Sequence, residues 1–280
     1  MQNNSDIENM QHILQFSSSE DTPIMLLREK GEITSRPLKG EQNFSFSPIK
    51  ACVGYKKMGE KWEKCTHGSL NVRQCPQCQF KDIARCYTVG DFSLYPELKE
   101  ELDSHKYIIY LAQFGEDITK VGLTRRSRYM QRWREQGADF AIALLEFDGP
   151  DQAYPAEQFI SYKFHFTSAV RASQKIKRIN FDSKKAKEKL QQAADEVLCA
   201  PQTEQFRTDE KIVDLSEFYP KIKSLEKSDF VGGKILGAKG QWLFYENPSG
   251  QHYASNINSQ ISRFLQEREN SGDLFRQAGL

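Results

Sequence analysis

Residues 107–133 read YIIYLAQFGEDITKVGLTRRSRYMQRW, a stretch that joins two strand-like runs to a dense group of positive charges. The two runs flank Gly-Glu-Asp, which predicts a β-hairpin with a tight turn. The next residues, 128–138, predict a helix that ends at Gly137, because glycine is common just past a helix C-terminus. Lys and Arg fill six of the fifteen positions in 120–134, and no acid is present there. This density predicts a surface that contacts phosphate groups.

The segments around this hairpin complete an α/β unit. Residues 140–147, FAIALLEF, predict a buried strand, and residues 151–166 predict a second helix. A further helix is predicted before the hairpin at 96–105, where proline suits the first helical turn. The predicted order from the hairpin onward is therefore strand, strand, helix, strand and helix.

The whole chain has the composition of a folded protein with little net charge. Of its 280 residues, 38% are hydrophobic and 11% aromatic, which argues against global disorder. Its 39 Lys and Arg against 38 Asp and Glu give a formal net charge of +1, so any nucleic-acid affinity has to come from local patches. No apolar run approaches the roughly 20 residues of a membrane span, and the N-terminus lacks a signal-peptide pattern. We therefore expect a cytoplasmic protein that does not bind membranes.

Five of the six cysteines fall within residues 52–86, and this clustering predicts a metal site. A Cys-x2-Cys pair directs two thiolates at one ion, and a second, looser pair completes the shell. We predict structural zinc, because four protein ligands leave no open position for water or substrate. The predicted ligands are Cys52, Cys65, Cys75 and Cys78. His67 and Cys86 compete with them, and the alternative interpretation is a group of ordinary reduced thiols.

The remaining segments complete a prediction of fold class and domains. The predicted class is mixed, α+β or α/β, with a zinc ribbon-like segment, a three-stranded sheet with flanking helices, and a small β-rich C-terminal domain. Near the end of the chain, residues 259–267 predict a helix. The predicted parts are a flexible N-terminus at 1–22, a β meander at 23–50, the cysteine-rich zinc-binding segment at 51–90, the α/β domain with its basic helix at 91–200, and the β-rich domain at 201–280.

Residues 107–166 resemble the GIY-YIG nuclease superfamily. In that superfamily a hairpin carries the GIY and YIG strands, a helix carries an Arg-Trp-like pair, and a later helix carries a glutamate. The similar segments here are YIIYLA at 107–112, KVGLT at 120–124, QRWREQ at 131–136 and PAEQF at 155–159. The resemblance implies a GIY-YIG-like three-stranded sheet with flanking helices and metal-dependent cleavage of phosphodiester bonds.

The same resemblance implies a set of catalytic residues. They are Tyr107, Tyr110, Lys120, Arg132 and Glu157. Either Tyr107 or Tyr110 matches the first tyrosine of the family, and Lys120 stands where these nucleases have their second one. An arginine grips a phosphate with two hydrogen bonds, and a glutamate holds Mg²⁺ or Mn²⁺. Lys120 acts either as a base, if its surroundings lower its pKa, or as a phosphate clamp.

Further arginines extend the predicted phosphate-binding surface. Those expected to contact nucleic acid are Arg125, Arg126, Arg128 and Arg134. Each site residue also has a plainer interpretation. For the tyrosines it is core packing, and for Glu157 it is a solvated position on a helix.

Three blocks together resemble an uncharacterised bacterial family of domains of unknown function. They are the cysteine block, the run KVGLTR with the RW and QGA that follow it, and GGKILGAKGQWL at 232–243. The sequence thus predicts a zinc protein that binds nucleic acid, with DNA favoured over RNA, and that cleaves it in the GIY-YIG manner. The alternative is a noncatalytic nucleic-acid-binding or assembly module in which zinc only supports the fold. The sequence leaves both open.

Overall fold

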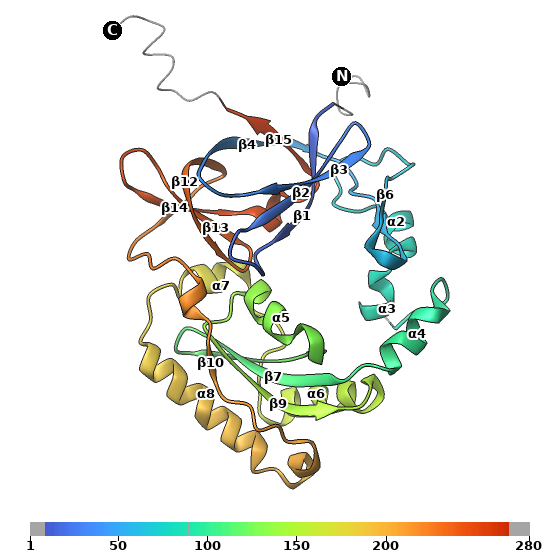
Figure 1. The fold of residues 1–280 in the computed structure, drawn as a ribbon, viewed down its shortest axis with the longest axis vertical. Coiled ribbons are helices and arrows are strands. Elements are labelled where there is room, and N and C mark those ends of the chain that lie inside the picture. Colours follow the sequence, from blue (N-terminus) through green and yellow to red (C-terminus); the bar gives the residue numbers. More distant parts are fainter. Residues whose placement is uncertain (1–8, 89, 269–280) are drawn as a thin grey trace, which may run out of the picture. The chain divides into compact units, whose positions relative to one another are not determined.

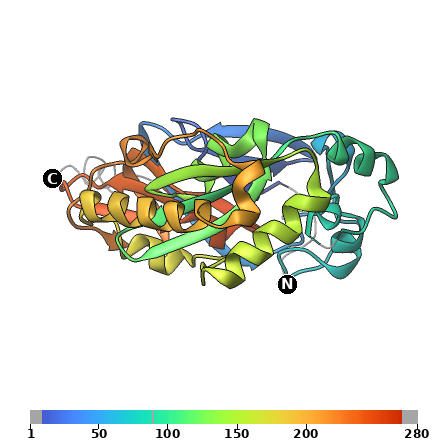
Figure 2. The ribbon, with the colours of Figure 1, turned by 90° about the horizontal axis from the view of Figure 1, so that it is seen from below.

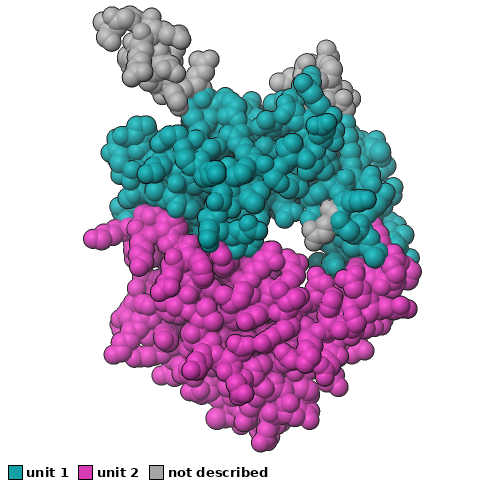
Figure 3. Space-filling view, in the orientation of Figure 1, with its two compact units in different colours: residues 1–94, 224–280 teal, residues 95–223 magenta. Residues whose placement is uncertain are grey.

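The computed structural model describes residues 9–88 and 90–268, and the chain divides into two compact units (Figure 3). Unit 1 is built from residues 1–94 and 224–280, and unit 2 from residues 95–223. Unit 2 is therefore one continuous stretch, whereas unit 1 combines segments from both ends of the sequence. The predicted domain 201–280 is accordingly divided between the two units.

A nine-stranded sheet forms the body of unit 1 (Figure 1). Its strands are β1 Gln11–Ser17, β2 Ile24–Glu29, β3 Glu32–Pro37, β4 Glu41–Lys50, β11 Glu226–Lys227, β12 Phe230–Lys239, β13 Trp242–Glu246, β14 His252–Asn256 and β15 Arg263–Glu267. Their order is β11-β14-β13-β12-β4-β15-β1-β2-β3, antiparallel except for the β11–β14 pair. Apolar side chains such as Leu14, Phe44 and Leu243 form one buried core along this sheet.

The N-terminal region differs from the flexible segment predicted at 1–22. Residues 1–8 lie outside the described residues, but β1 pairs with both β2 and β15. Ile13, Leu14 and Phe16 of this strand are buried. The polar residues that follow the strand have the composition of a loop, and one pairing partner comes from the other end of the sequence. Local composition therefore gave no indication of the strand.

The C-terminal strands also differ from the prediction, because they do not form a separate domain. β12 pairs with β4, and β15 pairs with β1 and β4. β4 thus leaves the β2–β3 hairpin, and residues 23–50 are not a simple meander. The helix predicted at 259–267 is a short 3₁₀ helix, η5 Ile257–Gln260, followed by β15. Periodicity alone does not separate a short apolar strand from a helix, and distant pairing partners decide the outcome here.

Unit 2 is a four-stranded sheet of order β10-β9-β7-β8 with flanking helices. Its strands are β7 Tyr107–Phe114, β8 Ile118–Arg125, β9 Phe140–Phe147 and β10 Val213–Asp214. Its helices are α4 Pro96–Asp103, α5 Tyr129–Gln136, α6 Pro150–Lys163, α7 Ala172–Ile176, α8 Ser183–Leu198, and the 3₁₀ turns η2 Arg126–Arg128, η3 Pro201–Phe206 and η4 Ser216–Phe218. The predicted hairpin, the third strand and the helices that flank them are confirmed, and β10 is an unpredicted fourth strand. No helix in the described part of the chain is long and apolar enough to cross a membrane.

Both faces of this sheet are covered, which explains why seven of the eight residues of β7 are apolar or aromatic and all eight are buried. One face packs against α6 and α8 through Tyr107 and Ile109, and Figure 2 shows these two helices on the same side of the strands. The other face packs against α5 and the segment after β10 through Ile108 and Tyr110. All eight residues of β7 are buried. A central strand covered on both faces loses the usual alternation of polar and apolar residues.

The cysteine-rich segment of unit 1 consists of short elements. They are β5 Tyr55–Lys56, η1 Met58–Glu60, β6 Trp62–Glu63, α2 Pro76–Lys81 and α3 Ala84–Thr88. β5 and β6 form an antiparallel pair of two residues each. Elements this short have few backbone hydrogen bonds of their own, so contacts between side chains have to hold the segment together.

Candidate functional site

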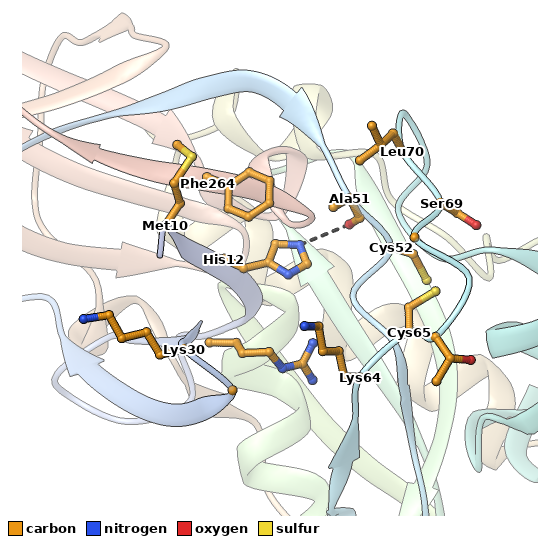
Figure 4. Close-up of a pocket in the computed structure, with 14 residues that line it drawn as sticks. Met10, His12, Lys30, Ala51, Cys52, Lys64, Cys65, Ser69, Leu70 and Phe264 are labelled. Atoms are coloured by element: carbon orange, nitrogen blue, oxygen red, sulfur yellow. Dashed lines mark hydrogen bonds between the residues drawn. The ribbon is translucent and has the colours of Figure 1, made fainter. Parts of the chain in front are cut away.

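Four cysteine thiols of unit 1 meet at one point. The Sγ atoms of Cys52, Cys65, Cys75 and Cys78 all lie within 4.8 Å of one another, and those of Cys65 and Cys75 are 3.8 Å apart. Figure 4 shows the Cys52 and Cys65 thiols close together at the wall of a cavity. Four sulfurs bound ~2.3 Å from one ion at tetrahedral angles lie about 3.8 Å from one another. These thiols, the same four that the sequence predicts as ligands, are therefore spaced closely enough to share a metal ion.

The backbone around the thiols is shaped to bring them together. Gly54 has a φ of +86°, and a Cβ there would lie 1.8 Å from the carbonyl oxygen of Glu63, so only glycine fits. The N–H groups of Gly54 and Cys75 donate hydrogen bonds to the Cys52 sulfur at 3.4 and 3.2 Å. Such bonds favour the thiolate, which is the form of cysteine that binds metal.

The two competing ligands lie outside this cluster. Cys86 is buried in α3, where its thiol donates a hydrogen bond to the Asp91 carbonyl oxygen at 3.3 Å. His67 is exposed. Within residues 9–88 and 90–268, the four-cysteine cluster is the one group of three or more Cys, His, Asp or Glu side chains close enough to share a metal ion.

Arg28 of β2 places a positive charge beside the thiols. It is 7% exposed, its Nη1 donates a hydrogen bond to the Val53 carbonyl oxygen at 3.0 Å, and its buried Nη2 has no hydrogen-bond partner among the described residues. Burial lowers the pKa of Arg28, and the nearby thiols Cys52 and Cys65 oppose that shift. Four thiolates around a divalent ion carry a net negative charge. Arg28 is placed to offset part of that charge.

A cavity of about 480 Å³ borders the thiols (Figure 4). Cys65, Arg28 and Lys64 line one part of it, and His12 and Phe264 line another with ring centroids 4.7 Å apart. Burial and the charge of Arg28 lower the pKa of His12 to about 4, so the imidazole is neutral at pH 7. The lining contains no acidic residue. Apart from the thiols, the charged residues that line the cavity are therefore all positive.

A second group of functional side chains gathers in unit 2 at the edge strand β8. Tyr110 of β7 lies directly opposite Gly122 of β8. A Cβ on Gly122 would lie 2.5 Å from the Tyr110 hydroxyl oxygen and 3.1 Å from the Lys120 Nζ. The Lys120 Nζ is 5.8 Å from the centre of the Tyr110 ring. Close approach of both polar side chains across β8 is therefore the reason for the glycine in Lys-Val-Gly.

The charges of Arg132 in α5 and Glu157 in α6 both affect the pKa values of Tyr110 and Lys120. Burial and the Arg132 guanidinium lower the pKa of Lys120 to about 8, and the Glu157 carboxylate opposes that shift. Burial raises the pKa of Glu157, and Lys120 opposes it. Burial also raises the pKa of Tyr110, whereas Arg132 opposes that shift through its charge and a hydrogen bond. Such mutual effects arise between groups in the same neighbourhood, and we call these four side chains the Tyr-Lys-Arg-Glu cluster.

α5 fixes the position of Tyr110. The Gln136 Nε2 donates a hydrogen bond to the Tyr110 hydroxyl oxygen at 2.7 Å, and the Trp133 ring packs edge-on at 5.9 Å between centroids. Tyr110 and Trp133 are each 1% exposed, so core packing also describes most of both rings. Gln136 is absent from the predicted site. Its place one helical turn after Arg132 is the sequence signal that points to it.

Tyr107 does not join the cluster. It is three residues before Tyr110 in the same strand, and side chains an odd number apart point to opposite faces of a sheet. Tyr107 therefore packs in the core under α6 and α8, and its hydroxyl donates a hydrogen bond to the Leu102 carbonyl oxygen at 3.2 Å. Of the two tyrosines considered for the first position, Tyr110 is the one beside Lys120.

Acids from elsewhere in unit 2 reach most of the arginines predicted to contact nucleic acid. Ion pairs join Arg125 to Glu101 at 3.6 Å, Arg126 to Glu146 at 3.5 Å and Glu210 at 2.6 Å, and Arg128 to Glu135 at 3.5 Å. The Arg134 guanidinium lies 4.3 Å from the centre of the Phe218 ring. Arg132 keeps half of its side chain exposed, with Glu135 at 3.6 Å. The tertiary structure thus leaves less free positive charge than the sequence indicates.

Both clusters lie within one recognised stretch of sequence. The sequence model of a family described as "Protein of unknown function (DUF2797)" matches residues 41–259, which include the cysteines and the Tyr-Lys-Arg-Glu residues. Arg28 and β1 lie before that stretch. No curated protein and no solved structure matches the chain. The match confirms the predicted resemblance to a family of unknown function, and because it covers more than half of the sequence, this chain belongs to the DUF2797 family.

Proposed function

We propose that unit 2 binds nucleic acid and cleaves phosphodiester bonds with a divalent cation, in the manner of GIY-YIG nucleases. One observation carries the proposal: Tyr110, Lys120, Arg132 and Glu157 come from four separate elements and lie together. A guanidinium, a carboxylate, an amine of lowered pKa and a phenol supply charge neutralisation, metal binding and proton transfer, which phosphodiester hydrolysis requires. Their order along the chain follows the GIY-YIG pattern.

Each of these residues has a role that follows from its chemistry. Arg132 binds the scissile phosphate through its guanidinium. Glu157 would hold Mg²⁺ or Mn²⁺, and such an ion would supply stabilisation of negative charge on the leaving oxygen. Because the pKa of Lys120 is about 8, a useful fraction of its amine is neutral near pH 7.5 and accepts a proton from the attacking water. The Tyr110 hydroxyl, fixed by Gln136, orients that water.

We further propose that the four-cysteine cluster holds zinc in a structural role. Four thiolates fill a tetrahedral shell and leave no position for water or substrate. The cluster ties the short elements of the cysteine-rich segment to one another, and Arg28 links it to β2. Zinc would therefore contribute folding free energy to unit 1 and no chemistry.

The direct test is a cleavage assay with the full-length protein. Supercoiled plasmid DNA and a structured RNA are incubated with Mg²⁺ or Mn²⁺. We expect cleavage that is lost in Arg132→Ala and in Glu157→Ala, and retained in Glu188→Ala, a control on the exposed side of α8. A wild-type protein that cleaves neither nucleic acid with either metal contradicts the catalytic proposal.

A noncatalytic nucleic-acid-binding or assembly module is the second candidate. It is favoured by Lys120, which stands in place of the second tyrosine of the GIY-YIG pattern. In such a module Lys120 and Arg132 only hold phosphate, so binding weakens steeply with salt and no cleavage occurs. Arg132→Ala and Glu157→Ala should then differ in their affinity for nucleic acid. Arg132→Ala lowers affinity for nucleic acid, whereas Glu157→Ala leaves it unchanged or raises it, because a lost carboxylate removes repulsion.

A further inference from the structure

Helix α6 exposes an unusual number of aromatic side chains. Among the described residues of unit 2, four large apolar side chains are exposed, and three of them belong to this helix. They are Tyr154 at 46%, Phe159 at 41% and Tyr162 at 83% exposure. Contiguous exposed apolar patches, unlike single exposed residues, mark interaction surfaces. α6 is also the helix that carries Glu157.

The three aromatic residues lie on the outer side of α6, and Glu157 falls between the first two of them along the chain. Ala153 and Ile160 are buried and define the inner side of the helix. Tyr154 and Tyr162 are eight residues apart, which is just over two turns and about 12 Å along the axis. Tyr154 lies one turn before Glu157. Burial and the Glu157 carboxylate raise the pKa of Tyr154, so the row begins beside the proposed cleavage site.

The chemistry of this row fits the bases of nucleic acid. Its large exposed members are all aromatic, and Lys163 adds a positive charge 5.2 Å from the centre of the Phe159 ring. Aromatic rings stack on unpaired bases of any sequence, and nearby cations attract the phosphates between them. A base-paired duplex keeps the faces of its bases inside the helix. A row of exposed aromatic side chains therefore favours the binding of unpaired strands.

We propose that the outer side of α6 is a base-stacking surface, and that the substrate class of unit 2 is single-stranded nucleic acid or the unpaired part of a branched one. The inference rests on the proposed function, because the stacked bases would hold the neighbouring phosphate at Lys120 and Arg132. The stacking surface supplies preference for unpaired strands, and the basic residues supply general attraction to phosphate.

The test measures the affinity of the full-length protein for a short fluorescein-labelled oligonucleotide by anisotropy, once single-stranded and once annealed to its complement. Tyr162→Ala is the first variant, because the side chain is 83% exposed and its loss should not affect folding. Loss of one stacked base weakens single-strand binding by roughly 5- to 100-fold. Tyr162→Phe keeps the ring and should retain the affinity. Duplex binding should change less than about twofold in both variants.

Either of two results would contradict the proposed stacking surface. One is single-strand affinity that is unchanged in both Tyr162→Ala and Tyr154→Ala. The other is a shift of oligomeric state, seen by light scattering of Tyr162→Ala, without any change in affinity, since that would assign the row to a second copy of the chain. A wild-type protein that binds neither oligonucleotide would overturn both this inference and the proposed function.

Arg132→Ala separates the two proposals when nucleic acid does bind. If Arg132→Ala weakens binding of both oligonucleotides while Tyr162→Ala and Tyr154→Ala each change neither, the phosphate site stands and the stacking surface fails. If Tyr162→Ala weakens single-strand binding while Arg132→Ala has no effect on binding or cleavage, the stacking surface stands and the proposed cleavage site fails.

Discussion

The cysteine cluster of unit 1 and the Tyr-Lys-Arg-Glu cluster of unit 2 are both groups of four side chains, but they are encoded in different ways. The cysteines fall within residues 52–78, and because the chain has only six thiols, residue type and spacing together point to the four that cluster. The second group spans residues 110–157 and uses residue types that occur throughout the protein. Its members become a group only through the positions of two strands and two helices. A group of cysteines that could share a metal ion can thus be recognised from residue type and spacing, whereas the Tyr-Lys-Arg-Glu group depends on the fold.

The two groups also differ in what they hold together. The four thiols join short elements that have little structure of their own. The Tyr-Lys-Arg-Glu cluster lies on a sheet whose two faces are already packed with apolar side chains. Loss of a cysteine should therefore unfold its surroundings, whereas loss of Arg132 or Glu157 should leave the fold intact.

The largest effect is expected from removal of a thiol. Cys78→Ser removes one of the four proposed zinc ligands, so the protein should no longer retain zinc and unit 1 should lose roughly 3 kcal/mol or more of stability. Metal content measured by atomic emission and hydrogen exchange followed by mass spectrometry check this, with Cys86→Ser as the control outside the cluster. Exchange should rise in the cysteine-rich segment and stay low in β7. Equal loss of protection in β7 would show that the effect of the substitution is not confined to unit 1.

A smaller loss of stability is expected from Gly122→Ala. The new methyl group would lie 2.5 Å from the Tyr110 hydroxyl oxygen, and such overpacking costs about 1–3 kcal/mol. Urea unfolding measures the change. In the Tyr110→Leu background the same substitution should cost much less, because the clashing group is gone. An equal cost in both backgrounds would show that Tyr110 does not determine the need for glycine.

Substitution of Arg28 tests whether a residue outside the cysteine-rich segment contributes to metal binding by the four cysteines. Arg28→Met removes the positive charge beside the thiolates, and loss of such supporting groups weakens metal binding by about 10- to 100-fold. Competition with a chromophoric chelator measures zinc affinity. Arg28→Lys should recover part of it, and Arg36→Met, an arginine of β3 away from the thiols, should have no effect. Unchanged zinc affinity in Arg28→Met would show that the four cysteines alone determine metal binding.

The smallest effect concerns the protonation of Lys120. Its pKa falls from 10.5 to about 8 in the folded protein, so the unfolded state binds more protons between these two pH values. The free energy of unfolding should therefore rise with pH from about 8 to 10.5, by roughly 1–2 kcal/mol after allowance for partial exposure. Lys120→Met should remove this rise and be more stable than wild type at pH 7. An identical pH profile in both proteins would contradict the lowered pKa.

Several elements of unit 2 follow from sequence because local interactions decide them. The hairpin β7–β8 has its turn residues between two apolar runs, and α5 ends at Gly137, which adopts the left-handed conformation that caps a helix. The four thiol ligands also follow from local spacing and residue type. The sequence alone therefore determined the core elements of unit 2 and the members of the four-cysteine cluster.

Only the tertiary structure decided the features that depend on residues distant in sequence. It placed β1 between β2 and β15, brought Arg28 to the thiols and put carboxylates beside arginines that have no acid near them along the chain. It also determined which face of β7 packs against α5, and therefore that Tyr110 and not Tyr107 contacts that helix. Strand pairing, burial and charge pairing act through space, and a sequence pattern records them only where the partners are neighbours in the chain.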